Sequence, residues 1–185
     1  MVVRIGRGDA PAWVARRLTG LAGTRWVGLD GLGAAGKTTL AHDIAAALPG
    51  AVVVSVDDFA RPGIATWDHD LFVREVLAPL SAGRPGHYRR WDLVADTPLE
   101  PVTVPPGAPV VVEGVSATDD RLPVPWDLTL WLDAPEAVRR TRIAERDTPE
   151  LLVRWVHDWW PEEQAYLAAQ DPPARVDAVI TADAP

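Results

Sequence analysis

The chain has 185 residues, with 18 basic and 26 acidic side chains and a formal net charge of -8 at pH 7. This charge argues against binding a nucleic-acid polymer or an anionic membrane through the protein surface. The absence of cysteine excludes disulfides, thiolate metal sites and thiol catalysis. The length favours one domain over residues 1–185, and the lack of a long uncharged apolar run leads us to expect a cytoplasmic protein. All basic residues are arginine except Lys37.

Apolar runs rich in β-branched residues alternate with helical patterns along the chain. In chain order we expect a strand at 25–29, a helix at 38–48, a strand at 51–56, a helix from 66 or 68 to 80, strands at 109–112 and 128–132, helices at 135–146 and 149–169, and a strand at 178–180. Strands that are apolar throughout and separated by helices indicate a parallel sheet covered on both faces, so the predicted fold class is α/β. Pro161 is expected to kink the last helix or to start a new one. Residues 84–107, rich in proline and charge, show no clear period.

Residues 31–38, GLGAAGKT, lie between a predicted strand and a predicted helix and match the pattern G-x-x-x-x-G-K-[ST] of a phosphate-binding loop, or P-loop. Glycines allow successive backbone N–H groups to converge on phosphate oxygens, and the following helix adds its positive end. We expect Lys37 on the β- and γ-phosphates of a nucleotide and the Thr38 hydroxyl in the shell of a Mg²⁺ ion. The residues expected to bind the nucleotide are Gly31, Gly33, Ala34, Ala35, Gly36, Lys37, Thr38 and Thr39.

The same glycines also match the dinucleotide-binding pattern G-x-G-x-x-G, and Asp57 lies 21 residues beyond Gly36, near where such a fold places its ribose-binding acid. This alternative explains neither Lys37 nor Thr38, and it gives Glu113 no task. The pattern therefore favours a nucleoside triphosphate over a dinucleotide.

Three acids stand where predicted strands end. Asp57 and Asp58 close the second strand, and Glu113 closes the third. Because the carboxyl ends of parallel strands face the bound phosphates, acids there can bind Mg²⁺ or take a proton from an acceptor. We predict that Asp57 is the general base and a candidate metal ligand, and that Glu113 binds Mg²⁺ together with Thr38. Any one of these acids could instead lie in a solvated turn or cap a helix.

Arg139, Arg142 and Arg146 share one face of the predicted helix 135–146. Three guanidinium groups on one face require anions opposite them. The transferring phosphoryl group is one such anion, so these arginines are predicted to act in catalysis. Nearby acids are the structural alternative: Asp133, Glu136 and Glu145.

Several separated segments together resemble the uridine kinase and phosphoribulokinase branch of the P-loop kinases. In chain order they are VGLDGLGAAGKTTLA, VDDF, WD at 67–68, WDLVADTPLEPVTVPP leading into VVVEG, VRRTRIAERD and VDAVI. The resemblance implies a three-layer fold, in which helices flank a parallel sheet and a short lid lies at about 139–150. It also implies transfer of the γ-phosphoryl group of ATP, with Mg²⁺, to a hydroxyl group of a small-molecule acceptor.

The resemblance also assigns residues to the acceptor. It places Asp57 where the family has its catalytic aspartate, and Asp68 where an acid holds the sugar hydroxyls of the acceptor. Trp91, Asp92 and Asp96 fall in the acceptor region. Uridine kinases commonly have a tyrosine at the position of Trp91 and a histidine at that of Asp96, so hydrogen-bonding capacity differs where specificity is set.

The expected acceptor is a nucleoside or a similar sugar-bearing molecule, and two other functions stay open. One is a kinase for nucleoside monophosphates or another small metabolite, and the other is a P-loop ATPase or nucleotide-binding module without a small-molecule acceptor. Basic residues that could bind the phosphate of an acceptor are Arg61, Arg74, Arg84, Arg89 and Arg90.

Aromatic residues allow two uses, stacking on a planar acceptor or packing within the protein. The candidates for an acceptor surface are Trp67, His87, Tyr88 and Trp91. Three further tryptophans are expected to pack the penultimate helix onto the sheet: Trp155, Trp159 and Trp160.

Overall fold

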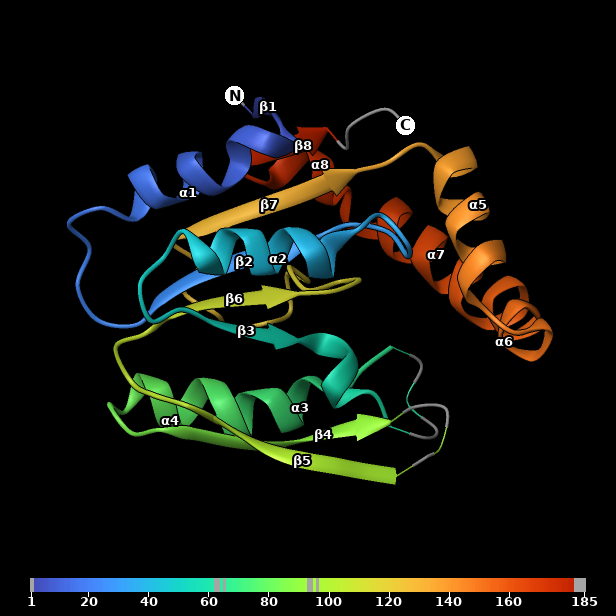
Figure 1. Ribbon diagram of the computed structural model, residues 1–185. Coiled ribbons are helices and arrows are strands. Elements are labelled where there is room, and N and C mark those ends of the chain that lie inside the picture. Colours follow the sequence, from blue (N-terminus) through green and yellow to red (C-terminus); the bar gives the residue numbers. More distant parts are fainter. Residues whose placement is uncertain (1, 62–63, 65, 93–94, 96, 182–185) are drawn as a thin grey trace.

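Six parallel strands form the central sheet of the molecule (Figure 1). The computed structural model describes residues 2–61, 64, 66–92, 95 and 97–181. The strand order is β1-β8-β7-β2-β6-β3. In chain order these strands are β1 (Val3–Gly6), β2 (Arg25–Asp30), β3 (Val52–Ser55), β6 (Pro109–Glu113), β7 (Leu128–Asp133) and β8 (Ala178–Thr181). The predicted parallel sheet is confirmed, and β1 is an edge strand that sequence reasoning did not identify.

Successive residues of the central strands pack into cores on opposite faces of the sheet. On β6, Val111 joins the core beneath α1 (Ala10–Leu18) and α2 (Lys37–Ala46), whereas Val110 and Val112 join the core on the other face. This strand is buried along its whole length. That burial is the reason for its uninterrupted apolar sequence.

The second face of the sheet is covered by a helical segment and a hairpin. The segment consists of α3 (His69–Phe72), η3 (Val73–Leu77) and α4 (Ala78–Ser81), and it lies between β3 and the hairpin in Figure 1. The remaining helices are η1 (Arg7–Asp9), η2 (Val56–Phe59), α5 (Glu136–Arg146), α6 (Pro149–Arg154), η4 (Trp155–Trp159), α7 (Trp160–Gln170) and α8 (Pro172–Arg175). No helix in the described part of the chain is both long enough and apolar enough to span a membrane.

Two long helical segments each contain a π-helical stretch. These stretches are η3 and η4, and in both cases a proline, Pro79 or Pro161, follows two residues after the stretch. Proline has no N–H group, and its ring crowds the carbonyl group four residues earlier. A widened turn accommodates this defect without ending the helix. Helix 149–170 is therefore continuous through Pro161.

Residues 84–107, for which the sequence shows no period, contain an antiparallel hairpin. Its strands are β4 (Gly86–Asp92) and β5 (Thr97–Val104), with a register shift between Arg89 and Trp91. Pro98 and Pro101 lie within β5 and interrupt its pattern, which a strand outside the main sheet tolerates. Tyr88 and Val104 are buried against the second face, so the hairpin extends the core beyond β3.

Candidate active site

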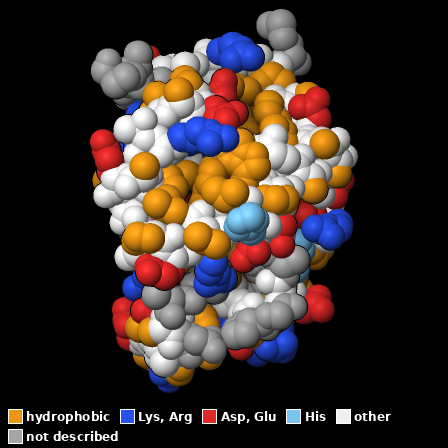
Figure 2. Space-filling model, turned by 90° about the vertical axis from the view of Figure 1, so that its right-hand side faces the viewer, with side chains coloured by type: hydrophobic (Ala, Val, Ile, Leu, Met, Phe, Trp, Pro, Cys, Tyr) orange, Lys and Arg blue, Asp and Glu red, His pale blue; other side chains and the backbone are white. Residues whose placement is uncertain are grey.

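A cavity of about 500 Å³ lies at the carboxyl edge of the sheet, the edge toward which the strands point in Figure 1. Its walls come from the P-loop, the turn after β3, residues 113–116 after β6, helix α5 and the long helix α6–η4–α7. Figure 2 looks onto this edge, where hydrophobic side chains gather across the middle and charged side chains surround them. The cavity brings together Lys37, Thr38, Asp57 and Glu113.

The P-loop backbone is held in place by cations. Each carbonyl group from residue 32 to residue 36 accepts a hydrogen bond from a positively charged side chain. The pairs are Leu32 with Lys37 Nζ (2.9 Å), Gly33 with Arg139 Nη1 (3.2 Å), Ala34 and Ala35 with Arg142 Nη1 (3.1 and 3.0 Å), and Gly36 with Arg7 Nη1 (3.4 Å). Since the C=O and N–H of a peptide point in opposite directions, fixing the carbonyls also fixes where the amide donors point. The loop is thereby preorganised for an anion.

Gly36 and Gly33 meet two different demands of the loop. Gly36 has φ +98° directly before α2, a left-handed conformation that glycine adopts without strain. At Gly33 the demand is close approach, because a Cβ atom there would lie 2.6 Å from Glu163 Oε1. These observations give a physical reason for two of the glycines in the motif.

The arginine row faces the P-loop, but its members have different environments. Arg139 is only 3 % exposed, does not line the cavity, and pairs with Glu163 at 3.4 Å. Arg142 and Arg146 do line the cavity, and Arg146 is paired with Asp147 at 2.6 Å. The partner of Arg139 is thus none of the acids that the sequence suggested. Of those acids, Glu136 pairs with Arg140 instead. Arg139 binds the Gly33 carbonyl and is not among the residues that line the cavity.

Thr38, Glu113 and Asp57 form the candidate Mg²⁺ site. The Thr38 hydroxyl donates a hydrogen bond to Glu113 Oε1 (3.2 Å), and Asp57 is exposed on the cavity wall. Burial raises the pKa of the Glu113 carboxyl, Lys37 lowers it, and Asp57 raises it. No cluster of three or more His, Asp or Glu side chains occurs within the described ranges. A hydroxyl and two carboxylates fit Mg²⁺, which keeps water and phosphate oxygens in its shell.

The two neighbouring aspartates after β3 point to different places. Asp58 is buried and accepts hydrogen bonds from Arg90 Nε (3.0 Å) and the Tyr88 hydroxyl (3.3 Å) on the hairpin. Burial raises the pKa of the Asp58 carboxyl, although these hydrogen bonds oppose the shift. Asp58 therefore anchors the hairpin, and Asp57 is the aspartate that faces the cavity.

The residues predicted to bind the acceptor lie away from the cavity walls. The Asp68 side chain caps α3 by accepting a hydrogen bond from Leu71 N (2.8 Å), and Asp92 accepts one from Ala95 N (2.9 Å). The ring of Trp91 stacks under the guanidinium group of Arg61, 4.6 Å away. None of these three predicted residues is among those that line the cavity. The fourth predicted residue, Asp96, lies outside the described residues.

Of the aromatic residues proposed to stack on an acceptor, Trp67 is the one on the cavity wall. Its indole N–H donates a hydrogen bond to Ser116 Oγ (3.1 Å), and its ring is 4 % exposed. Tyr88 is instead bonded to Asp58. Trp67 is thus a fixed apolar surface beside Thr66 and Ser116.

Sequence reasoning missed the contribution of the long helix 149–170. One face of this helix supplies five cavity residues: Trp155, Trp159, Glu162, Glu163 and Tyr166. Their spacing is that of a helical face, which is the signal that could have identified them. Trp155 and Trp159, which were expected to pack the helix onto the sheet, both line the cavity, and the ring of Trp155 packs against that of Trp160. Trp160 lies beneath the guanidinium groups of Arg139 and Arg140.

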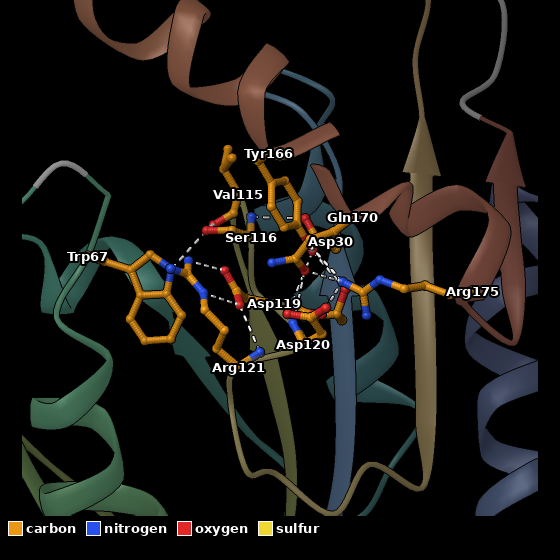
Figure 3. Close-up of polar contacts among 11 residues, drawn as sticks. Asp30, Trp67, Val115, Ser116, Asp119, Asp120, Arg121, Tyr166, Gln170 and Arg175 are labelled. Atoms are coloured by element: carbon orange, nitrogen blue, oxygen red, sulfur yellow. Dashed lines mark hydrogen bonds and ion pairs between the residues drawn. The ribbon is translucent and has the colours of Figure 1, made fainter. Parts of the chain in front are cut away.

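Asp30, at the end of β2, is the hub of a buried hydrogen-bond network (Figure 3). Its Oδ1 accepts from the N–H groups of Gly31 (2.7 Å) and Ser116 (3.0 Å). Its Oδ2 accepts from Thr118 N (2.9 Å), Thr118 Oγ1 (2.7 Å) and the Tyr166 hydroxyl (2.7 Å). Burial, followed by the nearby Asp30 charge, raises the pKa of Tyr166, so that side chain is a hydrogen-bond donor. The network ties the start of the P-loop to the turn after β6 and to α7.

Known proteins resemble this chain in structure. No protein-family model and no curated protein sequence matches it. A solved structure named as a possible uridine kinase from Bacillus stearothermophilus superposes with a TM-score of 0.71 at 20% identity, over 94% of this chain and 98% of that one. A "putative fructose transport system kinase" from Silicibacter sp. TM1040 superposes with a TM-score of 0.72 at 23% identity, over 95% of this chain and 98% of that one.

The central parallel sheet flanked by helices is the P-loop kinase fold. The fold that the sequence motifs imply is therefore confirmed. At these identities the likeness concerns the fold alone, and the activity has to be argued from the site.

Proposed function

We propose that this protein is an ATP- and Mg²⁺-dependent kinase that transfers the γ-phosphoryl group to a hydroxyl group of a small, uncharged acceptor such as a nucleoside or a related sugar. The observation that carries the proposal is the shared cavity. It joins a preorganised P-loop, with Lys37 and Thr38, to the exposed carboxylate of Asp57. A phosphate site and a candidate base in one cavity are the minimum that phosphoryl transfer to an alcohol requires.

Each residue then has a definite task. Lys37 and the P-loop amides bind phosphate oxygens. Asp57 takes the proton of the acceptor hydroxyl as the acceptor oxygen forms its bond to the γ-phosphorus. At the same time the bond between the γ-phosphorus and the leaving ADP breaks. Thr38 and Glu113 would hold Mg²⁺, which supplies charge neutralisation and alignment of the phosphates. Arg142, bonded to the loop and lining the cavity, adds positive charge beside them.

The distribution of cations favours an acceptor without a phosphate group. The arginines that could bind such a phosphate are Arg61, Arg74, Arg84, Arg89 and Arg90, and none of them is among the lining residues in the described part of the chain. The cavity cations are Lys37 and Arg142, which are bonded to the P-loop, and Arg146, which is paired with Asp147. The lining residues from the segments after β3 and β6 include uncharged side chains instead: Ala60, Thr66, Trp67 and Val115.

A screen of acceptors tests the proposal. ADP formation from ATP and Mg²⁺ is measured with nucleosides, nucleoside monophosphates, pentose phosphates, pantothenate and free sugars, including uridine and fructose, which two structural neighbours carry in their names. We expect slow ADP release without an acceptor and strong stimulation by an uncharged one. Equal hydrolysis with and without acceptors would contradict the proposal and support an ATPase module. Stimulation by a monophosphate alone would contradict the uncharged acceptor.

A further inference from the structure

One amide of the P-loop is already bound to an anion that belongs to the protein. Glu163 Oε1, on α7, accepts a hydrogen bond from Gly33 N at 2.7 Å. Its Oε2 pairs with Arg139 Nη1 at 3.4 Å, and the same Nη1 donates to Gly33 O at 3.2 Å. The two members of one buried ion pair therefore bind Gly33, Glu163 at its N–H group and Arg139 at its carbonyl oxygen.

The contact between Gly33 and Glu163 lies in the cavity that holds the predicted phosphate site. Glu163 lines the same cavity as Lys37 and Thr38, although the residue is only 4 % exposed. A buried carboxylate interacts strongly with other charges, because little water separates them. Backbone amides of a P-loop bind phosphate oxygens, so a carboxylate on one of them takes up part of an anion site.

We propose that Glu163 sets the affinity of the site by holding a negative charge at the Gly33 amide, so that a polyphosphate binds only as this carboxylate is neutralised. The inference rests on the proposed function insofar as it assumes that the P-loop binds a polyphosphate. It adds a negative residue to a site that the motif describes only by its positive groups. Arg139 is then a positioning residue, which holds Glu163 in place and never meets the transferring group.

The charges around Glu163 determine how the affinity for a polyphosphate should depend on pH. Those that share the cavity are Lys37, Asp57, Glu113, Arg142, Arg146 and Glu162, with Tyr166 as a further titratable group and Arg139 behind the loop. Burial raises the pKa of the Glu163 carboxyl, whereas the Gly33 N–H, Lys37 and Arg139 lower it. A polyphosphate placed beside the carboxylate would raise that pKa further. Binding then takes up a proton, so affinity is highest at low pH and falls as the pH rises through the pKa of the free protein.

Glu163→Gln tests the inference, because glutamine keeps the size of the side chain and an oxygen for Gly33 N but carries no charge. Binding of ATP and of inorganic triphosphate is measured by calorimetry and by tryptophan fluorescence. The indole nitrogen of Trp155 lies 3.3 Å from the position a Cβ of Gly33 would take, so one of the nine tryptophans lies beside the contact. We expect E163Q to bind both probes about tenfold more tightly, the factor that ~1.4 kcal/mol provides. Its affinity should also depend less on pH than that of the unaltered protein.

Glu162→Gln is the matched control. Glu162 is the next residue on the same helix and also lines the cavity, but it has no hydrogen bond to the P-loop among those described. Equal tightening in E162Q and E163Q would assign the effect to general charge and overturn the proposal. Unchanged or weaker binding by E163Q would also overturn it, while leaving the kinase assignment intact.

Two further outcomes complete the test. If E163Q does not fold, proton uptake is measured on the unaltered protein by calorimetry in two buffers of different ionisation enthalpy. Uptake on triphosphate binding supports the inference, and its absence overturns it. If neither the unaltered protein nor E163Q binds ATP or triphosphate, both this inference and the proposed function fail.

Discussion

Lys37 is nearly buried although it lies in the predicted phosphate site. The residue is 7 % exposed, and its ammonium group is bonded to the Leu32 carbonyl at 2.9 Å. A compact ammonium on a flexible stem can turn from that carbonyl to a phosphate oxygen, which a larger planar guanidinium does less readily. In a chain whose other basic residues are all arginine, this position alone requires lysine.

The first prediction concerns the removal of this charge. We expect Lys37→Ala to reduce phosphoryl transfer by about 100- to 1000-fold, the cost of losing one group that stabilises the transition state. The variant should still fold, as judged by circular dichroism, since one loop contact is lost. Arg74→Ala is the control, because it removes a cation that is paired with Glu75 outside the cavity. Retained turnover in K37A would remove the P-loop from the mechanism.

The second prediction separates two adjacent aspartates. Asp57→Asn should still bind ATP but lose about 100- to 10,000-fold in turnover, the usual contribution of a general base. Asp58→Asn should retain the chemical step but lose about 1–3 kcal/mol of stability, because one of the two carboxylate oxygens that accept from the exposed Arg90 and the buried Tyr88 becomes an amide nitrogen. Turnover numbers and denaturation curves of the two variants provide the comparison. The reverse pattern would move the base to Asp58.

At the scale of single residues, the P-loop motif and the acids beside it could be predicted from the sequence. The residues that bind the P-loop from other parts of the chain could not. Lys37 and Thr38 follow from the P-loop pattern, and Asp57 and Glu113 follow from strand ends, because parallel strands bring those ends to one edge. Helical spacing places Glu163 on the face of 149–170 that lines the cavity, but it does not identify the partner of Glu163. Glu163 meets Gly33 across 130 residues of chain, and no local pattern specifies that contact.

The turn after β6 shows how one element depends on the next. Gly114 has φ +147°, and a Cβ atom there would collide with Val56 Cγ2 on η2. The backbone of one strand end thus packs directly against the turn that carries Asp57. Close approach of this kind requires the absence of a side chain.

The third prediction follows from this contact. Gly114→Ala should lower the free energy of unfolding by about 1–3 kcal/mol, the range of overpacking and backbone strain. Turnover should fall as well, since η2 carries Asp57. Gly8→Ala is the control, because no atom lies within 4 Å of its added Cβ and its φ is not positive. Urea denaturation of both variants gives the comparison, and equal stability in the two would contradict the packing argument.

The elements themselves were largely predictable, with exceptions that have physical causes. The strands of the main sheet other than β1 are mainly apolar runs, most of them buried, and hydrophobic pattern identifies such strands well. The hairpin was not predicted because Pro98 and Pro101 disrupt the alternating pattern expected of β5. Strand β1 alternates between half-buried and exposed residues over only four positions, which is too short for a reliable pattern.

The cavity couples distant parts of the molecule, so a ligand there should stabilise the whole fold. The fourth prediction is that ATP at about a hundred times its dissociation constant adds about 2.7 kcal/mol, which corresponds to a melting temperature roughly 5–10 °C higher. Differential scanning fluorimetry measures the shift. Adenosine, which lacks phosphates, should give little change, and K37A should respond less to ATP than the unaltered protein. A shift with adenosine as large as that with ATP would contradict a phosphate-based site.

The contacts between α7 and the P-loop also affect the order in which the site forms while the chain is synthesised. The P-loop leaves the ribosome before its partners, since Glu163 and Tyr166 follow Gly33 and Asp30 by 130 and 136 residues. Closing such long loops costs entropy that only the finished sheet and helices can offset. A nascent chain therefore carries the complete nucleotide motif before the contacts that shape it can form. The hydrogen-bond network of Asp30 and the charge of Glu163 beside Gly33 are in place only when α7 has docked.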